Sequence, residues 1–303
     1  MRDQAEPLRE RMRRLAADAV HPQAAAPASG TARVLAVTSG KGGVGKSNVA
    51  LNVALALARA GKRVVLVDSD IGFANLDVLM GIAPRFHLLD LVRRRLSVWD
   101  VLTEGPEGIR FLAGGSGVDL LLSLEEEALG YLFSQLEQLE EVADVVLFDT
   151  GAGLSSHGLR VLQAADDILL VTTPEPTALT DAYALVKLLV QQASGGPGLP
   201  SFAVWLIVNR VRSRREGEEV ARRLVTVAQR FLNLSIAVLG WIPEDDHVRR
   251  AVQLQQPLLV AYPYAPAAKE VARIARTFAD GDAPAIRRPG GIRQFLHRLF
   301  NRL

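Results

Sequence analysis

A glycine-rich segment, residues 40–47, restricts the possible folds of this chain more than any other part of its sequence. It stands between a short aliphatic run and a long helical stretch, and it consists of Gly40, Lys41, Gly42, Gly43, Val44, Gly45, Lys46 and Ser47. This order fits G-x-x-x-x-G-K-[ST] in the strand–loop–helix context in which that motif binds phosphates. Glycines allow successive backbone N–H groups to face phosphate oxygens, and the helix N-terminus adds its positive dipole end. We therefore expect a phosphate-binding loop in which Lys46 contacts the β- and γ-phosphates and Ser47 binds Mg²⁺, rather than a plain glycine-rich turn.

Short aliphatic runs alternate with longer amphipathic ones through most of the chain. We expect strands at residues 34–38, 64–67, 109–113, 145–148, 168–172, 203–208 and 236–239. Continuously aliphatic strands separated by helices are typical of parallel strands that are buried on both faces. The pattern predicts an α/β fold, with a mostly parallel, twisted sheet of about seven or eight strands and helices on both faces.

Composition narrows the classes of protein further. The chain has 303 residues, 49% of them hydrophobic, a length that fits either two domains or one large α/β domain. It has no cysteine, which excludes disulfides, thiolate metal sites and iron–sulfur clusters. No apolar run reaches the ~18–20 residues needed to span a bilayer, and the N-terminus lacks the apolar region of a signal peptide. We expect a cytoplasmic protein.

The two ends of the chain differ from its body. Residues 1–20 are compatible with a helix, residues 21–32 are small and punctuated by Pro, Gly and Ser, and residues 281–291 form a second such linker. These linkers isolate a body at residues 33–280 and a last segment at residues 292–303. The formal net charge is +2; the first twenty residues contribute +1 and residues 283–303 contribute +5, which leaves −4 for residues 21–282.

The phosphate-binding loop contains a second lysine, Lys41, which cannot share the position of Lys46 on the same phosphates from inside one subunit. With this lysine the loop resembles the deviant Walker A motif, KGGxGK[ST], of the MinD/ParA group of P-loop ATPases (the SIMIBI class of P-loop NTPases). In that group the extra lysine reaches across a dimer interface to the partner's nucleotide. The resemblance implies an ATP-bound homodimer that hydrolyses ATP with Mg²⁺; the alternative is a solvated loop lysine.

Carboxylates follow two of the expected strands. Asp68 and Asp70 stand at i and i+2 at a strand end, so both point toward the crevice where parallel sheets bind ligands. The resemblance implies that Asp70 orients the attacking water and that Asp68 lies near the metal. It also implies that Asp149, after residues 145–148, holds Mg²⁺ and that the Gly151 N–H senses the γ-phosphate.

Three further segments match the family. Asn209 and Arg210 end one strand, and Ile242, Pro243 and Glu244 follow another. The resemblance implies that the Asn and the backbone around the Pro recognise adenine, although either segment could be an ordinary strand-end turn.

Residues 173–177, Thr-Pro-Glu-Pro-Thr, precede a predicted helix and resemble the family loop that packs near the partner's signature lysine. The resemblance makes Glu175 a contact across the dimer; the alternative is a plain acidic residue at a helix start.

The last segment is an amphipathic helix by its spacing. Its apolar residues recur at i, i+3, i+4, i+7, i+8 and i+11 and are Ile292, Phe295, Leu296, Leu299, Phe300 and Leu303. A helix docked on the body would also need such a stripe. Dense arginine without any acid favours an interfacial helix on an anionic membrane surface, and the segment resembles the membrane-targeting sequence of MinD.

At the other end, residues 3–9 read Asp-Gln-Ala-Glu-Pro-Leu-Arg and resemble the DQAxxLR motif of the flagellar number and placement regulators FlhG, FleN and YlxH. In that subgroup the motif activates a partner signal-recognition-type GTPase, FlhF; here its residues are Asp3, Gln4, Leu8 and Arg9. Pro7 departs from a plain helix and fits only in the first turn. The alternative for Gln4 is a polar residue in a frayed helix.

These features predict an ATP-dependent dimerising switch that binds the inner face of the cytoplasmic membrane reversibly and regulates flagellar number and placement. The expected partners are a second copy, FlhF, and flagellar C-ring (switch) proteins or a flagellar transcription regulator. A MinD-type septum-positioning ATPase is one alternative. A ParA-like DNA-partitioning ATPase is another, although the acidic body predicts no specific nucleic acid. A non-enzymatic nucleotide-binding scaffold is expected to lack Asp70, which is present.

Overall fold

The computed structural model describes residues 31–70, 75–114, 125–153, 155–193, 202–280 and 290–300. Its strands are β1 (Arg33–Thr38), β2 (Val64–Ser69), β3 (Thr103–Glu104), β4 (Arg110–Leu112), β5 (Val145–Thr150), β6 (Asp167–Thr172), β7 (Ala203–Val211) and β8 (Ile236–Pro243). Its helices are α2 (Lys46–Arg59), α3 (Leu76–Met80), α4 (Leu88–Arg93), α5 (Val98–Val101), α7 (Glu126–Glu137), α8 (Ser156–Ala164), α9 (Pro176–Ala193), α10 (Arg214–Leu232), α11 (Asp246–Gln253), α12 (Leu258–Ala261), α13 (Pro266–Ala279) and α14 (Gly291–Phe300), with short 3₁₀ turns η1 (Pro106–Gly108) and η2 (Gln138–Glu141).

One eight-stranded sheet runs through the molecule in the order β3-β4-β2-β5-β1-β6-β7-β8. All pairs are parallel except β3 with β4. The predicted fold class is therefore confirmed, and all seven predicted strands are present. The sequence pattern did not predict β3, because a two-residue strand has too few positions to show a period.

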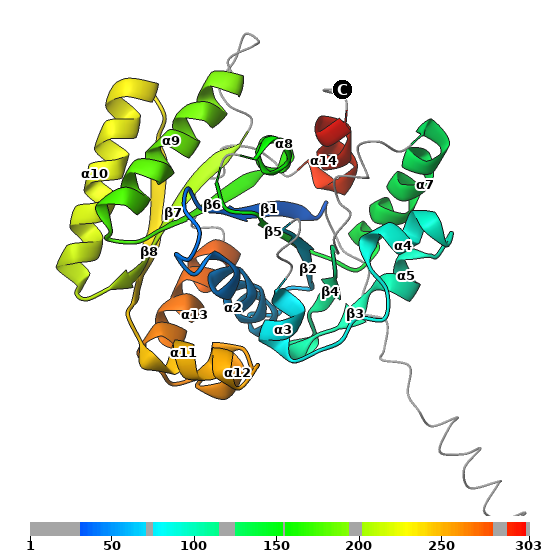
Figure 1. The fold of residues 1–303 in the computed structure, drawn as a ribbon, viewed down its shortest axis with the longest axis horizontal. Coiled ribbons are helices and arrows are strands. Elements are labelled where there is room, and N and C mark those ends of the chain that lie inside the picture. Colours follow the sequence, from blue (N-terminus) through cyan, green and yellow to red (C-terminus); the bar gives the residue numbers. More distant parts are fainter. Residues whose placement is uncertain are drawn as a thin grey trace, which may run out of the picture.

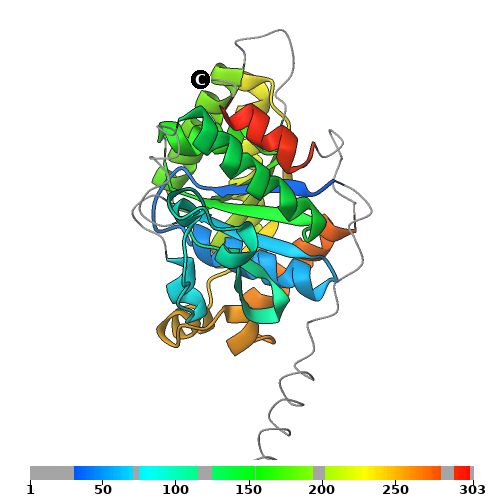
Figure 2. The same ribbon diagram turned by 90° about the vertical axis from the view of Figure 1, so that its right-hand side faces the viewer.

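Helices cover both faces of the sheet in two layers (Figures 1 and 2). One face packs against α2, α11, α12 and α13, and the other against α7, α8, α9, α10 and α14. Since side chains alternate along a strand, β1 sends Leu35 to the first layer and Val34 and Ala36 to the second. The carboxyl ends of β1, β2 and β5 meet at one edge, where the loop from β1 to α2 lies.

The predicted C-terminal helix is present as α14, but its apolar face lies on the body. Ile292, Phe295 and Leu296 are buried in the core of the second layer, and Leu299 and Phe300 pack against that core. The Phe295 ring stacks on Phe148 of β5, with 4.7 Å between ring centroids. Leu303 lies outside the described residues.

The stripe expected to be free for a membrane is thus covered, and the reason is that the groove between α7 and α8 is itself apolar. Burying one side chain of this size contributes about 1.5–3 kcal/mol. Acidic residues of the body add polar contacts: Ile292 N–H donates to Glu140 (2.7 Å), and Gly290 N–H and the Arg298 guanidinium donate to Asp166 (3.2 and 3.4 Å). The sequence favoured a bilayer because of its dense arginine without any acid, but a bilayer and an apolar groove require the same stripe, so the pattern could not exclude docking.

The predicted N-terminal helix and the two predicted linkers fall mostly on residues that the structure does not describe. The helix, with Asp3, Gln4, Leu8 and Arg9, lies wholly outside the described residues, as do most of both linkers.

In the part of the chain that is described, no helix combines the length and the apolar character needed to cross a membrane.

Candidate nucleotide site

The loop between β1 and α2 has the geometry of a phosphate cradle. Gly43 and Gly45 have φ of 80° and 91°, in the left-handed region that favours glycine. A Cβ on Gly40 would lie 2.2 Å from the backbone carbon of Asp181 in α9, so only glycine fits there. The loop ends at Lys46, where α2 begins and directs its first N–H groups toward the cradle.

Lys46 is buried between two carboxylates. Its Nζ lies 2.7 Å from Asp149 Oδ1 at the end of β5 and 3.7 Å from Asp70 Oδ2 after β2. The Ser47 hydroxyl is 3.2 Å from Lys46 Nζ and also hydrogen-bonds to Asp149. Burial raises the pKa of the Asp149 carboxyl, while the Lys46 ammonium opposes that shift. The predicted residues Lys46, Ser47, Asp70 and Asp149 are therefore brought together.

Asp68 connects this group to α3. Its carboxylate accepts backbone N–H bonds from Asp70 (3.1 Å), Asn75 (3.1 Å) and Leu76 (3.2 Å). Burial, followed by repulsion from Asp149, raises the pKa of Asp68 to about 6, although these three donors favour the charged form. Asp68 therefore holds the start of α3 in place, and it lies close to Asp149, the proposed metal ligand.

Asp70 lies beside the turn that follows β5. A Cβ on Gly151 would stand 3.0 Å from Asp70 Oδ1, so a side chain at this position would crowd the carboxylate. Gly153 N–H donates to Ser39 O (2.9 Å), and the Ser69 hydroxyl donates to Asp149 O (2.9 Å). These bonds join the loops after β1, β2 and β5 at one point.

Lys41 lies at the rim, apart from Lys46. Its Nζ donates to Glu175 Oε2 and to the Thr177 hydroxyl, both at 2.9 Å. This pair lowers the pKa of the exposed Glu175 carboxyl. Glu175, predicted to contact the partner's lysine, contacts the lysine of its own subunit in this structure. Thr177 was not predicted as a site residue; its place in the first turn of α9, two residues after Glu175, was the available signal.

The residues predicted to bind adenine lie at the adjacent ends of β7 and β8. Asn209 is buried and donates through Nδ2 to Val44 O of the loop (2.8 Å). Arg210 is exposed with φ of 57°, and Glu244 N–H donates to Val211 O (2.9 Å). The Ile242 side chain belongs to the core, so only its backbone can line a site.

Pro243, next to Ile242, pairs in register with Val211. The strand ends that carry Asn209 and Pro243 therefore stand side by side.

The donor set fits a magnesium nucleotide. Mg²⁺ prefers hard oxygen ligands and is usually held by one or two carboxylates together with phosphate oxygens. The Ser47 hydroxyl and the Asp149 carboxylate are such donors and already touch one another. Lys46, the loop N–H groups and the N-terminus of α2 supply positive charge for the phosphates.

A parallel sheet with this loop after β1 and with carboxylates after β2 and β5 defines a P-loop ATPase. The chain belongs to the CobQ/CobB/MinD/ParA nucleotide-binding domain family, whose family model matches residues 35–258.

Sequence relatives group the chain with flagellar regulators. It is 39% identical over 267 residues to the antiactivator FleN of Pseudomonas aeruginosa, and the match covers 88% of this chain and 93% of FleN. It is 34% identical over 226 residues to the flagellum site-determining protein YlxH of Helicobacter pylori, 74% of each chain being covered. The expected subgroup is thereby confirmed.

Solved structures agree on the fold. The MinC:MinD cell division complex of Aquifex aeolicus contains a chain that matches with a TM-score of 0.64 and 26% identity over 85% of this chain and 99% of that one. MinD of Pyrococcus horikoshii, complexed with Mg-ADP, matches with a TM-score of 0.66 over 85% of this chain and 100% of that one. The latter is 24% identical and shows the fold alone.

Proposed function

We propose that this chain is an ATP-dependent dimerising switch that acts in flagellar number and placement. The observation that carries the proposal is the separation of the two loop lysines. Lys46 is buried among the carboxylates of its own site, whereas Lys41 stands at the rim with a side chain 39% exposed. A positive charge at that place is suited to the nucleotide of a second subunit, and Glu175 is suited to the partner's Lys41.

Hydrolysis in this proposal uses the residues that meet at the strand ends. Ser47 and Asp149 would hold Mg²⁺, with Asp68 close by, and the bound ion would neutralise charge on the β- and γ-phosphates. Asp70 stands beside Gly151 and would orient the attacking water. The Gly151 N–H would donate to the γ-phosphate. Asn209, Arg210 and the backbone at residues 242–244 would face the base.

Reversible membrane binding requires that α14 leave its groove, and its packing is suited to that. A cavity of about 60 Å³ remains in the groove, lined among others by Leu132, Phe148 and Leu296. Arg160 of α8, the helix that packs beside α14, has a buried guanidinium nitrogen without a hydrogen-bond partner. Both defects lower the cost of release.

Dimerisation would then strengthen membrane binding. One short amphipathic helix binds weakly, but two on one dimer raise avidity by effective concentration, by ~10²-fold or more. The arginines of the segment favour anionic headgroups.

The flagellar part of the proposal rests on the relatives FleN and YlxH and on the DQAEPLR segment. Gln4 would help to arrange the catalytic water of the GTPase FlhF, since an amide can both donate and accept. The full-length chain should then accelerate GTP hydrolysis by FlhF, and Gln4→Ala should abolish this effect while ATP turnover stays unchanged. Equal acceleration by both forms, measured as phosphate release, would show that Gln4 has no such role.

Vesicle sedimentation tests the switch as a whole. Wild-type protein should pellet with phosphatidylglycerol vesicles in Mg-ATP and stay in solution in Mg-ADP. Lys41→Ala should bind a fluorescent ATP analogue normally but stay in solution, because it cannot complete the dimer. Lys46→Ala should lose nucleotide binding as well. Pelleting of Lys41→Ala at the wild-type level in Mg-ATP would contradict the proposal.

The second candidate function is septum positioning of the MinD type, because the chain is also 32% identical over 228 residues to the septum site-determining protein MinD of Bacillus subtilis. It uses the same site and the same helix, so the effect of Gln4→Ala on FlhF separates the two. A DNA-partitioning role is disfavoured by the net charge of −4 on residues 21–282.

A further inference from the structure

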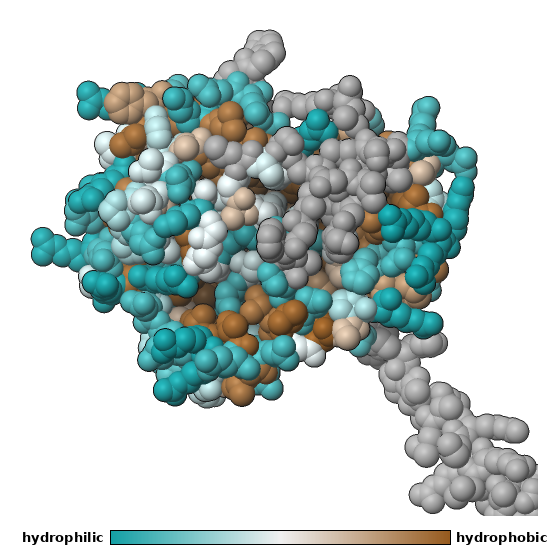
Figure 3. Space-filling view, in the orientation of Figure 1, coloured by the Kyte–Doolittle hydropathy of each residue, from teal (hydrophilic) through white to brown (hydrophobic). Residues whose placement is uncertain are grey.

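One region of the surface exposes several large apolar side chains. Within the described ranges, eight large apolar residues are strongly exposed, and five of them lie on α3 or between α11 and the start of α13. We call these five the α3/α11/α12 patch: Val78 (49% exposed), Val252 (41%), Leu254 (57%), Val260 (38%) and Tyr264 (84%). Figure 3 shows apolar surface gathered over α3, α11 and α12. Apolar patches of this kind mark interaction sites.

The patch is continuous with the nucleotide edge of the sheet. The segment that leads to α3 begins at the carboxyl end of β2, and α11 begins three residues after the end of β8. Figures 1 and 2 show α3, α11 and α12 on the side of the molecule where the loop between β1 and α2 lies. The two parts of the patch touch, since a Cβ on Gly81, after α3, would stand 2.7 Å from Gln255 O, after α11.

The patch is also tied to the nucleotide site by hydrogen bonds. Asp68, beside Asp149, accepts the N–H groups of Asn75 and Leu76, where α3 begins. α3 carries Val78 and ends against Gln255. One short helix, α3, therefore connects the end of β2 with the patch.

We propose that the α3/α11/α12 patch is the apolar part of the homodimer interface, and that its occupant is the surface of a second copy of this chain. This inference rests on the proposed dimer, and it adds the location of the apolar contact between the two copies. Stable interfaces bury about 800 Å² on each partner around an apolar centre. The rim of the loop exposes Gly42, Gly43, Lys41 and Glu175, which are small or charged, so the apolar area must come from elsewhere on this face.

The charge distribution around the patch is compatible with contact between two copies of the chain. The exposed residues between its apolar side chains are the uncharged Gln253, Gln255 and Gln256. The nearby acid Asp246 is already paired with Arg249 at 2.8 Å. The exposed Arg250 of α11 stands beside this pair, so two copies can approach with the uncharged glutamines at the centre and with charges of both signs at the border.

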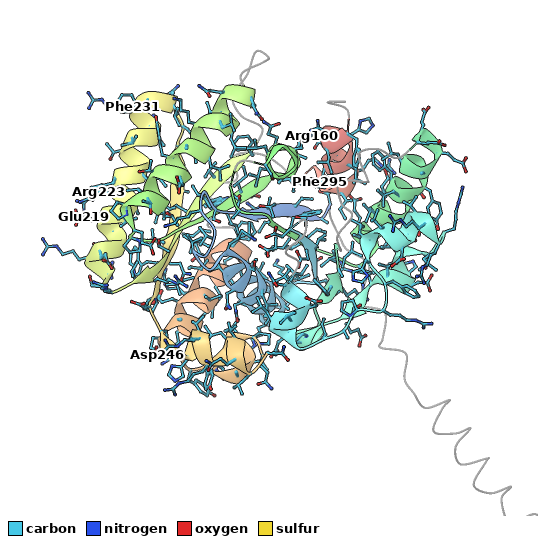
Figure 4. All side chains as sticks on the ribbon, in the orientation of Figure 1. Arg160, Glu219, Arg223, Phe231, Asp246 and Phe295 are labelled. Atoms are coloured by element: carbon cyan, nitrogen blue, oxygen red, sulfur yellow. The ribbon has the colours of Figure 1, made fainter. Side chains whose placement is uncertain are left out.

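Single thiols give a direct test, because the native chain has no cysteine. The variant Leu254→Cys is made in an Asp70→Ala background, which is expected to retain ATP. Its alkylation by a maleimide is measured in Mg-ATP and in Mg-ADP, and light scattering gives the mass of the protein in the same sample. We expect alkylation about tenfold slower in Mg-ATP. Phe231→Cys is the matched control: Phe231 is 66% exposed but lies at the end of α10 that leads into the start of β8, at the opposite edge of the sheet from Asp246 (Figure 4). Its alkylation rate should not change.

A second variant measures the contribution to affinity. Leu254→Glu should weaken ATP-dependent dimerisation about tenfold or more, as expected for an apolar anchor, while binding of a fluorescent ATP analogue stays unchanged. A dimer in which the Leu254→Cys thiol is unprotected, together with an unaffected Leu254→Glu variant, would overturn the inference and leave the proposed function standing. Protection in a sample that stays monomeric would overturn the choice of a second copy. A monomer without protection would remove the proposed dimer together with the inference.

Discussion

Lys41 and Lys46 are five positions apart in one loop, yet their surroundings differ. Lys46 is buried against Asp149. The motif predicts this position, because its sequence specifies the strand, the loop and the helix that hold Lys46. Lys41 pairs with Glu175 of the same subunit, a contact between exposed side chains. An exposed ion pair of this kind contributes about 0–1 kcal/mol to stability. The sequence pattern therefore does not determine which carboxylate Lys41 contacts, and a group of a partner subunit can replace Glu175 of the same chain.

Asp68 offers a prediction about pH. Its pKa is raised from 3.8 to about 6, so between these values the native state binds a proton that the unfolded state has lost. The free energy of unfolding of the nucleotide-free protein should therefore fall as pH rises from about 4 to about 6, by up to about 3 kcal/mol. Asp68→Asn, which carries no charge, should raise the Tm at pH 7.5 and by only about half as much at pH 5, because the loss accumulates across the whole range from about pH 4 to about pH 6.

Thermal unfolding at the two pH values checks this. Asp246→Asn is the matched control, because Asp246 is exposed, and its effect on Tm should be small at both. If the change in Tm between wild type and Asp68→Asn is the same at pH 5 and pH 7.5, the charged Asp68 carboxylate does not destabilise the native state, which would contradict the prediction.

At the scale of the element, α14 marks what sequence periodicity can and cannot predict. The stripe predicted the helix and its apolar face correctly, because both follow from a period of 3.6 residues. It did not predict the docked position, which depends on an apolar groove built from α7, α8 and β5, far away in the sequence. In the same way, the two-residue β3 is fixed by its pairing with β4 rather than by its own residues.

The same helix supplies the prediction about membranes. Leu299→Glu places a carboxylate within the apolar stripe, which costs several kcal/mol in an acyl environment. We expect the variant to lose Mg-ATP-dependent pelleting with anionic vesicles while ATP binding survives. Gln294→Glu is the control, because it adds the same charge at an exposed position of the helix, and it should lose at most part of the binding. Pelleting of Leu299→Glu at the wild-type level would show that the helix serves the body alone.

At the scale of the molecule, the seven predicted strands, the phosphate-binding loop and the carboxylates after β2 and β5 were all predictable, because parallel α/β folds repeat one local rule. The α3/α11/α12 patch was not, since its side chains come from two segments more than 170 positions apart. What the whole molecule does with ATP depends on whether the site is completed by a second copy.

Light scattering of the Asp70→Ala variant in Mg-ATP and Mg-ADP measures this dependence. The substitution removes the carboxylate proposed to orient water and leaves the phosphate-binding loop intact, so ATP should be bound and retained. We predict twice the mass of one chain in Mg-ATP and the mass of one chain in Mg-ADP. One chain's mass in both nucleotides, with ATP binding confirmed in the same sample, would contradict the proposed switch.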